Sequence, residues 1–101
     1  MKKKYEIQYL EIAKDDLDQI FEYILNDYPN RALEILNEID DSVSKLAVFP
    51  KLGKLPKDDK LKAIGYRILV INNYLVFYVI TDTFVEIHRI LHSSRDYNNL
   101  L

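Results

Sequence analysis

The sequence of 101 residues contains no cysteine, only two glycines and only three prolines. The absence of cysteine excludes disulfide bonds and thiolate metal sites. The scarcity of glycine and proline argues against collagen-like and low-complexity disordered chains. A long apolar run is also missing, because Asn72-Asn73 interrupts the most apolar stretch. A membrane-spanning helix needs about 20 such residues, so none is expected.

The composition fits one core in one domain, which we expect to span residues 1–101. Hydrophobic residues make up 49% of the chain and charged residues 30%. The net charge is −2, with −5 in residues 1–50 and +3 in residues 51–101. This is far from the strongly basic profile of a typical nucleic-acid binder. Polar residues follow the N-terminal lysines at once, where a secretory signal has an apolar run. We therefore expect a cytoplasmic protein with no membrane partner.

The spacing of apolar residues predicts the order of secondary structure. Period-two alternation predicts a strand at about 4–10, and helical spacing predicts two amphipathic helices, ending at 26–30 and at Phe49-Pro50. A basic loop follows at 50–62. Three strands are then expected at about 64–71, 74–81 and 84–91, before a short tail from His92 to Leu101. The expected fold class is α+β: an N-terminal strand, a two-helix antiparallel hairpin, then a three-stranded antiparallel meander.

Two short turns set the register expected for these strands. Asn72-Asn73 pairs Ile71 with Tyr74, and Asp82-Thr83 pairs Ile80 with Val85 and Val76 with Arg89. One face of the sheet then carries Arg67, Leu69, Ile71, Tyr74, Val76, Tyr78, Ile80, Val85, Ile87, Arg89 and Leu91. The other carries Ile68, Val70, Leu75, Phe77, Val79, Phe84, Glu86, His88, Ile90 and His92.

Both faces are apolar at their centres, and the two helices can cover only one of them. The uncovered face is expected to expose an apolar patch of the kind that marks a partner site. The alternative is that the C-terminal tail folds over it. His88 and His92 do not form a metal site, because four residues along a strand place them about 13 Å apart. No metal, no other cofactor and no small-molecule substrate is expected.

Short motifs lie in a fixed order along nearly the whole chain. They are Ala13, Asp16-Leu17, Ile20 and Tyr23-Ile24, then Ala32, Ile35 and Ile39, then Leu46, Pro50, Gly53 and Gly65-Tyr66-Arg67, then Tyr74-Leu75-Val76-Phe77-Tyr78, Val85, Ile87, Arg89-Ile90-Leu91-His92, Arg95-Asp96-Tyr97 and Leu100-Leu101. Together they resemble the RelE/ParE superfamily of toxins from type II toxin–antitoxin modules. The fold of that family, two helices on a small antiparallel sheet, agrees with the order derived from the residues.

The resemblance implies a toxin that is neutralised by a cognate antitoxin protein and is associated with growth arrest and plasmid stabilisation. RelE-like members cut messenger RNA on the ribosome, whereas ParE-like members are described as inhibitors of DNA gyrase. The nucleases carry cations on the central strands, which stabilise phosphate charge in the transition state. The corresponding positions here are Leu75 and its expected partner Val70. This departure favours a ParE-like inhibitor, with a ribonuclease or a degenerate, non-toxic antitoxin binder as alternatives.

Two sets of candidate site residues follow. A ribonuclease would use Arg67 and Arg89 as anion contacts, with His92, Arg95 and Tyr97 at positions where nucleolytic relatives place acid/base and phosphate-binding groups. Alternatively, the two strand arginines pair with acidic helix residues at the rim of the core, and the tail contacts a target or anchors the terminus. The residues expected to bind the antitoxin or the target are Ile68, Val70, Leu75, Phe77, His92 and Arg95.

Overall fold

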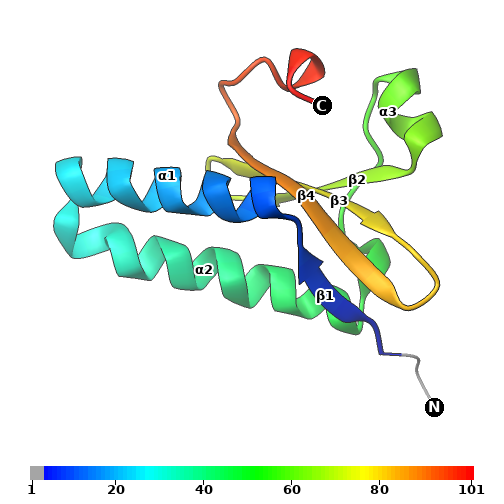
Figure 1. Ribbon diagram of the computed structural model, residues 1–101, viewed down its shortest axis with the longest axis horizontal. Coiled ribbons are helices and arrows are strands. Elements are labelled where there is room, and N and C mark those ends of the chain that lie inside the picture. The colour runs from blue at the N-terminus through cyan, green and yellow to red at the C-terminus, as the bar shows by residue number, and fades with distance from the viewer. Residues whose placement is uncertain (1–3) are drawn as a thin grey trace.

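The computed structural model describes residues 4–101; residues 1–3 of the expected domain lie outside the described part (Figure 1). The elements are β1 (Glu6–Tyr9), α1 (Glu11–Asp27), α2 (Ala32–Ser44), α3 (Asp59–Ile64), β2 (Tyr66–Ile71), β3 (Tyr74–Ile80) and β4 (Phe84–His92). Single 3-10 turns lie at Pro29–Arg31, Lys45–Ala47, Pro50–Leu52 and Tyr97–Asn99. The expected β-α-α-β-β-β order is confirmed, with α3 as an addition. Within residues 4–101 no helix has the length and apolarity to cross a membrane.

The four strands form one mixed sheet in the order β1-β4-β3-β2. The meander β2-β3-β4 is antiparallel as expected, whereas β1 lies parallel to β4. The hairpin register predicted from Asn72-Asn73 is confirmed from Ile71–Tyr74 to Leu69–Val76. Asn72 has a φ of 53°, in the left-handed region that a tight turn of this kind needs and that asparagine tolerates.

Helix α3 lies in the segment expected to be a basic loop, so that part of the expectation is wrong. The Asp58 carboxylate accepts hydrogen bonds from the backbone N–H groups of Lys60 and Leu61, which caps the first turn. Gly65, with a φ of 101°, ends the helix in the left-handed conformation. Strand β2 therefore begins at Tyr66, two residues later than expected.

A β-bulge at His88 corrects the register expected for the end of β4. Tyr78 pairs with Ile87 but Phe77 pairs with Arg89, which leaves His88 as an extra residue. Val76 therefore pairs with Ile90, and the predicted Val76–Arg89 pair is wrong. From Arg89 onward, each residue of β4 lies on the face opposite to the expected one. The physical reason is that regular pairing would direct Arg89 toward the helices, whereas the bulge places Ile90 there.

The two helices pack on one face of the sheet and bury the larger of two apolar clusters. In Figure 1, α1 and α2 run antiparallel, while α3 and the C-terminal tail lie on the side of the sheet away from α2. The larger cluster contains Ala13, Ile24, Ala32, Ile39, Val43 and Leu46 from the helical part and Leu69, Ile71, Tyr74, Val76, Tyr78, Val85, Ile87 and Ile90 from the sheet.

The centre of the second face is covered as well, so the expected open apolar patch is wrong there, although Val70 on β2 is 51% exposed. Ile68, Phe77 and Leu91 are buried there together with Leu61 of α3 and Tyr66. The tail side chains of Tyr97, Leu100 and Leu101 pack against this cluster. Tyr97, Leu100 and Leu101 are half-buried against this face, so the alternative of a tail that folds over the sheet is confirmed.

Candidate functional site

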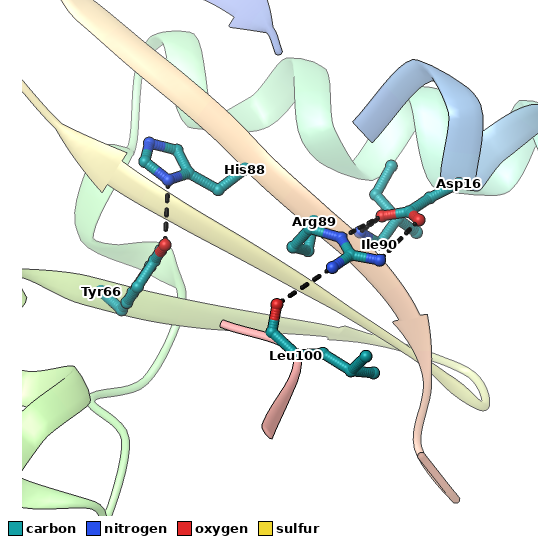
Figure 2. A network of polar contacts seen from close by, with 6 residues as sticks. All are labelled: Asp16, Tyr66, His88, Arg89, Ile90 and Leu100. Carbon is teal, nitrogen blue, oxygen red and sulfur yellow. Dashed lines mark hydrogen bonds and ion pairs between the residues drawn. The ribbon is translucent and has the colours of Figure 1, made fainter. Parts of the chain in front are cut away.

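A buried ion pair joins α1 to the end of β4 (Figure 2). The Arg89 guanidinium donates from Nε to Oδ2 of Asp16 at 2.8 Å and from Nη2 to Oδ1 at 3.0 Å. Its Nη1 donates to the backbone oxygen of Leu100 at 3.1 Å. Hydrogen bonding to Asp16 is the main reason why the pKa of Arg89 is raised above its ordinary value. All three nitrogens of the Arg89 guanidinium therefore donate hydrogen bonds to α1 or to the C-terminal tail.

The same carboxylate closes an exposed edge of the sheet. Strand β1 ends at Tyr9, which pairs with Ile87, so the later residues of β4 have no strand beside them on that edge. Oδ2 of Asp16 accepts the backbone N–H of Ile90 at 3.0 Å and replaces the missing strand. A carboxylate with two arginine donors and one amide donor is well satisfied despite its burial. These three hydrogen bonds explain why α1 has an acidic residue, Asp16, on its buried side.

Tyr66, His88 and Glu86 form a second polar chain on the strands. The Tyr66 hydroxyl lies 3.0 Å from Nδ1 of His88, and Nε2 of His88 lies 3.2 Å from Oε1 of Glu86. Burial raises the pKa of Tyr66, and the nearby Arg89 charge partly opposes that shift. A phenol with a raised pKa is a poor nucleophile at neutral pH. The phenol therefore keeps its proton at neutral pH, and the two contacts fix the orientation of the Tyr66 and His88 rings.

Arg67 and Tyr78 hold the segment that precedes α3. Arg67 Nη1 donates to the backbone oxygen of Gly53 at 2.8 Å and to that of Lys51 at 3.4 Å. The buried Tyr78 hydroxyl donates to the oxygen of Pro50 at 2.6 Å and accepts the N–H of Gly53 at 2.9 Å. Burial raises the pKa of Tyr78 although the Gly53 hydrogen bond and Arg67 act in the opposite direction. Arg67 is thus committed to backbone oxygens.

A groove of about 920 Å³ opens between α1, the β2–β3 turn and the end of β4. It is lined by Asp16, Gln19, Ile20, Tyr23, Ile24, Tyr28, Arg31, Ile35, Asn72, Asn73, Tyr74, Ile90, Leu91, His92, Ser94 and Arg95. Within residues 4–101, the guanidinium groups of Arg31 and Arg95 have no hydrogen-bond or ion-pair partner. The lining therefore combines apolar surface with unpaired positive charge.

His92 is oriented at one end of this groove. Its Nδ1 lies 2.8 Å from the Ser94 hydroxyl and 3.1 Å from the Ser94 backbone nitrogen. Its ring stands edge-on to Tyr74, with the centroids 5.5 Å apart. Burial raises the pKa of Tyr74, so this phenol keeps its proton at neutral pH. Nε2 of His92 has no hydrogen-bond partner in the described part of the chain.

The structure separates the five residues expected to serve a ribonuclease. His92 and Arg95 line the groove together, but Arg67 and Arg89 are engaged elsewhere. Tyr97 packs on Phe77 across the second face, with ring centroids 5.1 Å apart. The pairing of Arg89 with an acidic helix residue is the structural alternative that the sequence had left open. No three His, Asp or Glu side chains in residues 4–101 are grouped to hold a metal ion.

The expected binding residues also fall in different places. His92 and Arg95 are exposed in the groove, and Val70 is 51% exposed on β2. Ile68 and Phe77 are buried, with Leu75 half-buried beside them. The sequence reasoning did not identify the contribution of Arg31 and Tyr28 to the groove. Their position at the turn between the two helices, next to Pro29, is the signal that could have indicated an exposed rim.

Comparison with known proteins decides the family. A family model described as "ParE toxin of type II toxin-antitoxin system, parDE" matches residues 7–97. The chain belongs to the ParE toxin family. A chain of the chromosomal ParDE toxin–antitoxin system from P. aeruginosa superimposes with a TM-score of 0.74 at 20% identity, covering 88% of this ParE-family chain and 96% of that one. No curated protein sequence matches.

Two solved complexes share the fold of this ParE-family toxin at lower similarity. A chain of the RelBE2 toxin–antitoxin complex from Mycobacterium tuberculosis gives a TM-score of 0.57 at 23% identity, covering 88% of this chain and 98% of that one. A chain of the E. coli DinJ-YafQ complex gives 0.53 at 15% identity, covering 97% and 98%. These identities are low, so the neighbours support the fold and the family supports the toxin assignment.

Proposed function

We propose that this ParE-type toxin arrests growth by inhibiting DNA gyrase and is neutralised by an antitoxin protein that binds the groove. Its place in the ParE family over residues 7–97 carries the proposal. The chemistry of the sheet supports it. The three antiparallel strands contain two arginines, Arg67 and Arg89, and both have partners within the fold. A nuclease needs free cations near the scissile phosphate, and Val70 and Leu75 supply none.

The groove suits an amphipathic, acidic antitoxin helix. Its apolar lining can accept one helix face, while Arg31 and Arg95 can pair with carboxylates at the rim. The predicted contacts at His92 and Arg95 belong to this groove. Those at Ile68, Leu75 and Phe77 require the tail to leave the sheet, because Tyr97 and Leu100 pack over that cluster. We therefore assign the first contact of the antitoxin to the groove.

A ribosome-dependent ribonuclease is the second candidate, because His92 and Arg95 share one groove and Nε2 of His92 is unpaired. The test is induction of the chain alone in bacterial cells with pulse-labelling of DNA and protein synthesis. We expect DNA synthesis to fall first and purified gyrase to lose supercoiling activity. An earlier fall in protein synthesis contradicts the gyrase proposal and favours the nuclease. No arrest at all favours a degenerate antitoxin binder.

The antitoxin contact is tested by the double substitution Arg31→Glu and Arg95→Glu. We expect it to weaken the complex with the cognate antitoxin at least about tenfold, because two attractive charges become repulsive. The matched control is Lys14→Glu with Lys60→Glu, which reverses two exposed charges outside the groove. Equal antitoxin affinity in both double variants contradicts the placement of the contact.

A further inference from the structure

The segment between α2 and α3 exposes apolar side chains among lysines. Val48 is 40% exposed, Leu52 53% and Leu55 54%. Lysines flank these residues along the chain, and those at positions 45, 51, 54 and 57 are all exposed. No hydrogen bond or ion pair of a lysine side chain in this segment is found within residues 4–101. Isolated exposed apolar residues are ordinary, but several within one short segment indicate an interaction surface.

This exposure does not come from a loose loop. The backbone of the segment is held from beneath by the Tyr78 hydroxyl and by Arg67, which bind Pro50, Gly53 and Lys51. Lys54 adds two backbone hydrogen bonds to Ile68 of β2, at 2.8 and 2.9 Å. A buried tyrosine and an arginine thus fix a conformation that directs leucines outward. Preorganised segments bind partners with a smaller entropic cost.

A hollow of about 410 Å³ lies beside this segment, between the end of α2 and strand β2. Its lining contains two lysines and no acidic residue: Ser42, Lys45, Leu52, Gly53, Lys54, Ile68, Leu69 and Val70. We name the exposed side chains Lys45, Leu52, Lys54, Leu55 and Val70 the basic–apolar surface. None of the residues that line the hollow lines the groove described above.

The charge of this region is opposite to that of the rest of the molecule. Residues 45–62 carry six lysines and two aspartates, whereas the whole chain has a net charge of −2. One of the two aspartates, Asp58, is occupied in capping α3. A partner that matches the basic–apolar surface is therefore acidic and carries apolar side chains. A nucleic acid fits less well, because single-stranded bases are held by stacking rings and arginines, and this surface offers leucine, valine and lysine.

We propose that the basic–apolar surface is where this toxin engages its target protein, through an acidic segment of the target that bears apolar side chains. The inference rests on the proposed function as a toxin with a protein target. It adds that target and antitoxin use separate surfaces. An antitoxin bound in the groove then inhibits the toxin by steric hindrance or by sequestration, without covering Leu52 and Lys54.

The test is the double variant Leu52→Glu with Lys54→Glu, which reverses the character of the surface and keeps the backbone bonds of Lys54. We expect growth arrest to be lost in cells and the concentration for half-inhibition of purified gyrase to rise at least about tenfold. Antitoxin binding and the melting temperature should stay close to those of the wild type. The matched control is Leu33→Glu with Lys14→Glu, because Leu33 is 64% exposed on α2 and Lys14 is exposed on α1.

Each result decides a different part of the reasoning. Wild-type arrest and inhibition in the Leu52→Glu, Lys54→Glu variant overturn the assignment of the surface. If the wild type arrests growth but does not inhibit gyrase, gyrase is refuted as the target. Growth arrest by the variant then still tests whether the basic–apolar surface contacts the target. Loss of antitoxin binding in the variant overturns the separation of the two surfaces. Binding of a fluorescein-labelled 12-nucleotide RNA by the wild type but not by the variant overturns the choice of a protein partner.

Discussion

Gly53 is a position where the backbone has no space for a side chain. A Cβ atom built there lies 2.7 Å from the Tyr78 hydroxyl oxygen, 2.8 Å from its Cε1 and 2.9 Å from the Ile68 oxygen. The backbone angles of Gly53, φ −71° and ψ 157°, suit any residue, so the constraint is contact and not conformation. Substitution by alanine therefore forces Tyr78, which is fully buried, to move or the segment to lift away from β2.

The cost of Gly53→Ala follows from the bonds that this movement breaks. If the ring shifts, the Tyr78 hydroxyl loses the Pro50 oxygen or the Gly53 N–H, and each buried group left without a partner costs about 1–3 kcal/mol. Overpacking alone costs about 1–3 kcal/mol. We therefore expect Gly53→Ala to lower the free energy of unfolding by about 3 kcal/mol. Lys54→Ala, next in the chain and exposed, should change it by less than about 0.5 kcal/mol.

The assay is urea unfolding of Gly53→Ala, Tyr78→Phe and the double variant. Removal of the hydroxyl relieves the closest contact, so the double variant should be more stable than the sum of the single effects predicts, by about 1–2 kcal/mol. A Gly53→Ala protein as stable as the wild type refutes the close contact. Additive single effects refute the assignment of the clash to the hydroxyl.

Three further outcomes are expected. Asp16→Ala should cost about 3 kcal/mol in urea unfolding, because it leaves Arg89 without its carboxylate partner, whereas Asp15→Ala should change little; equal effects contradict the role of the buried pair. Removal of residues 97–101 should expose Phe77 and increase binding of the dye ANS, and unchanged dye binding shows that the tail does not cover this face. Stability should fall as the pH rises above about 10, because burial raises the pKa of four tyrosines above the value of 10.0 that each has when unfolded. The folded state then keeps protons that the unfolded state releases, so unfolding followed by tyrosine absorbance should coincide with titration of Tyr9, Tyr66, Tyr74 and Tyr78.

Much of the fold could be predicted from local patterns. The Asn72-Asn73 turn set the β2–β3 register correctly because a two-residue turn leaves no freedom in the pairing. Helix α3 was not predicted because it is short and follows Pro50 and Pro56 closely, although Asp58 and Gly65 are ordinary start and stop signals. The parallel pairing of β1 with β4 depends on contacts far apart in the chain, which spacing alone does not encode.

The candidate site was harder to predict than the fold. The roles of Arg67 and Arg89 depend on their hydrogen-bond partners in the fold. These partners, Gly53 for Arg67 and Asp16 for Arg89, are far from them in the sequence. The bulge did leave a trace, because His88-Arg89 and Ile90-Leu91 are adjacent polar and apolar pairs that break strict alternation. Arg31 and Arg95 come from distant segments, and only the folded chain shows that both line one groove.

The bulge at His88 changes the parity of β4. Before it, odd-numbered residues face the helices, and after it even-numbered residues do, as Ile87 and Ile90 show. Substitutions in this strand therefore act on one face at a time. Because His88 is the extra residue, its deletion would keep the Phe77–Arg89 and Val76–Ile90 pairs in a regular ladder and leave the faces of the following residues unchanged. Loss of the bulge with His88 retained would instead direct Arg89 beneath the helices and move Ile90 out of the core. Related sequences that are one residue shorter here should therefore keep the same two faces without a bulge, and what they give up is the contact between the Tyr66 hydroxyl and His88.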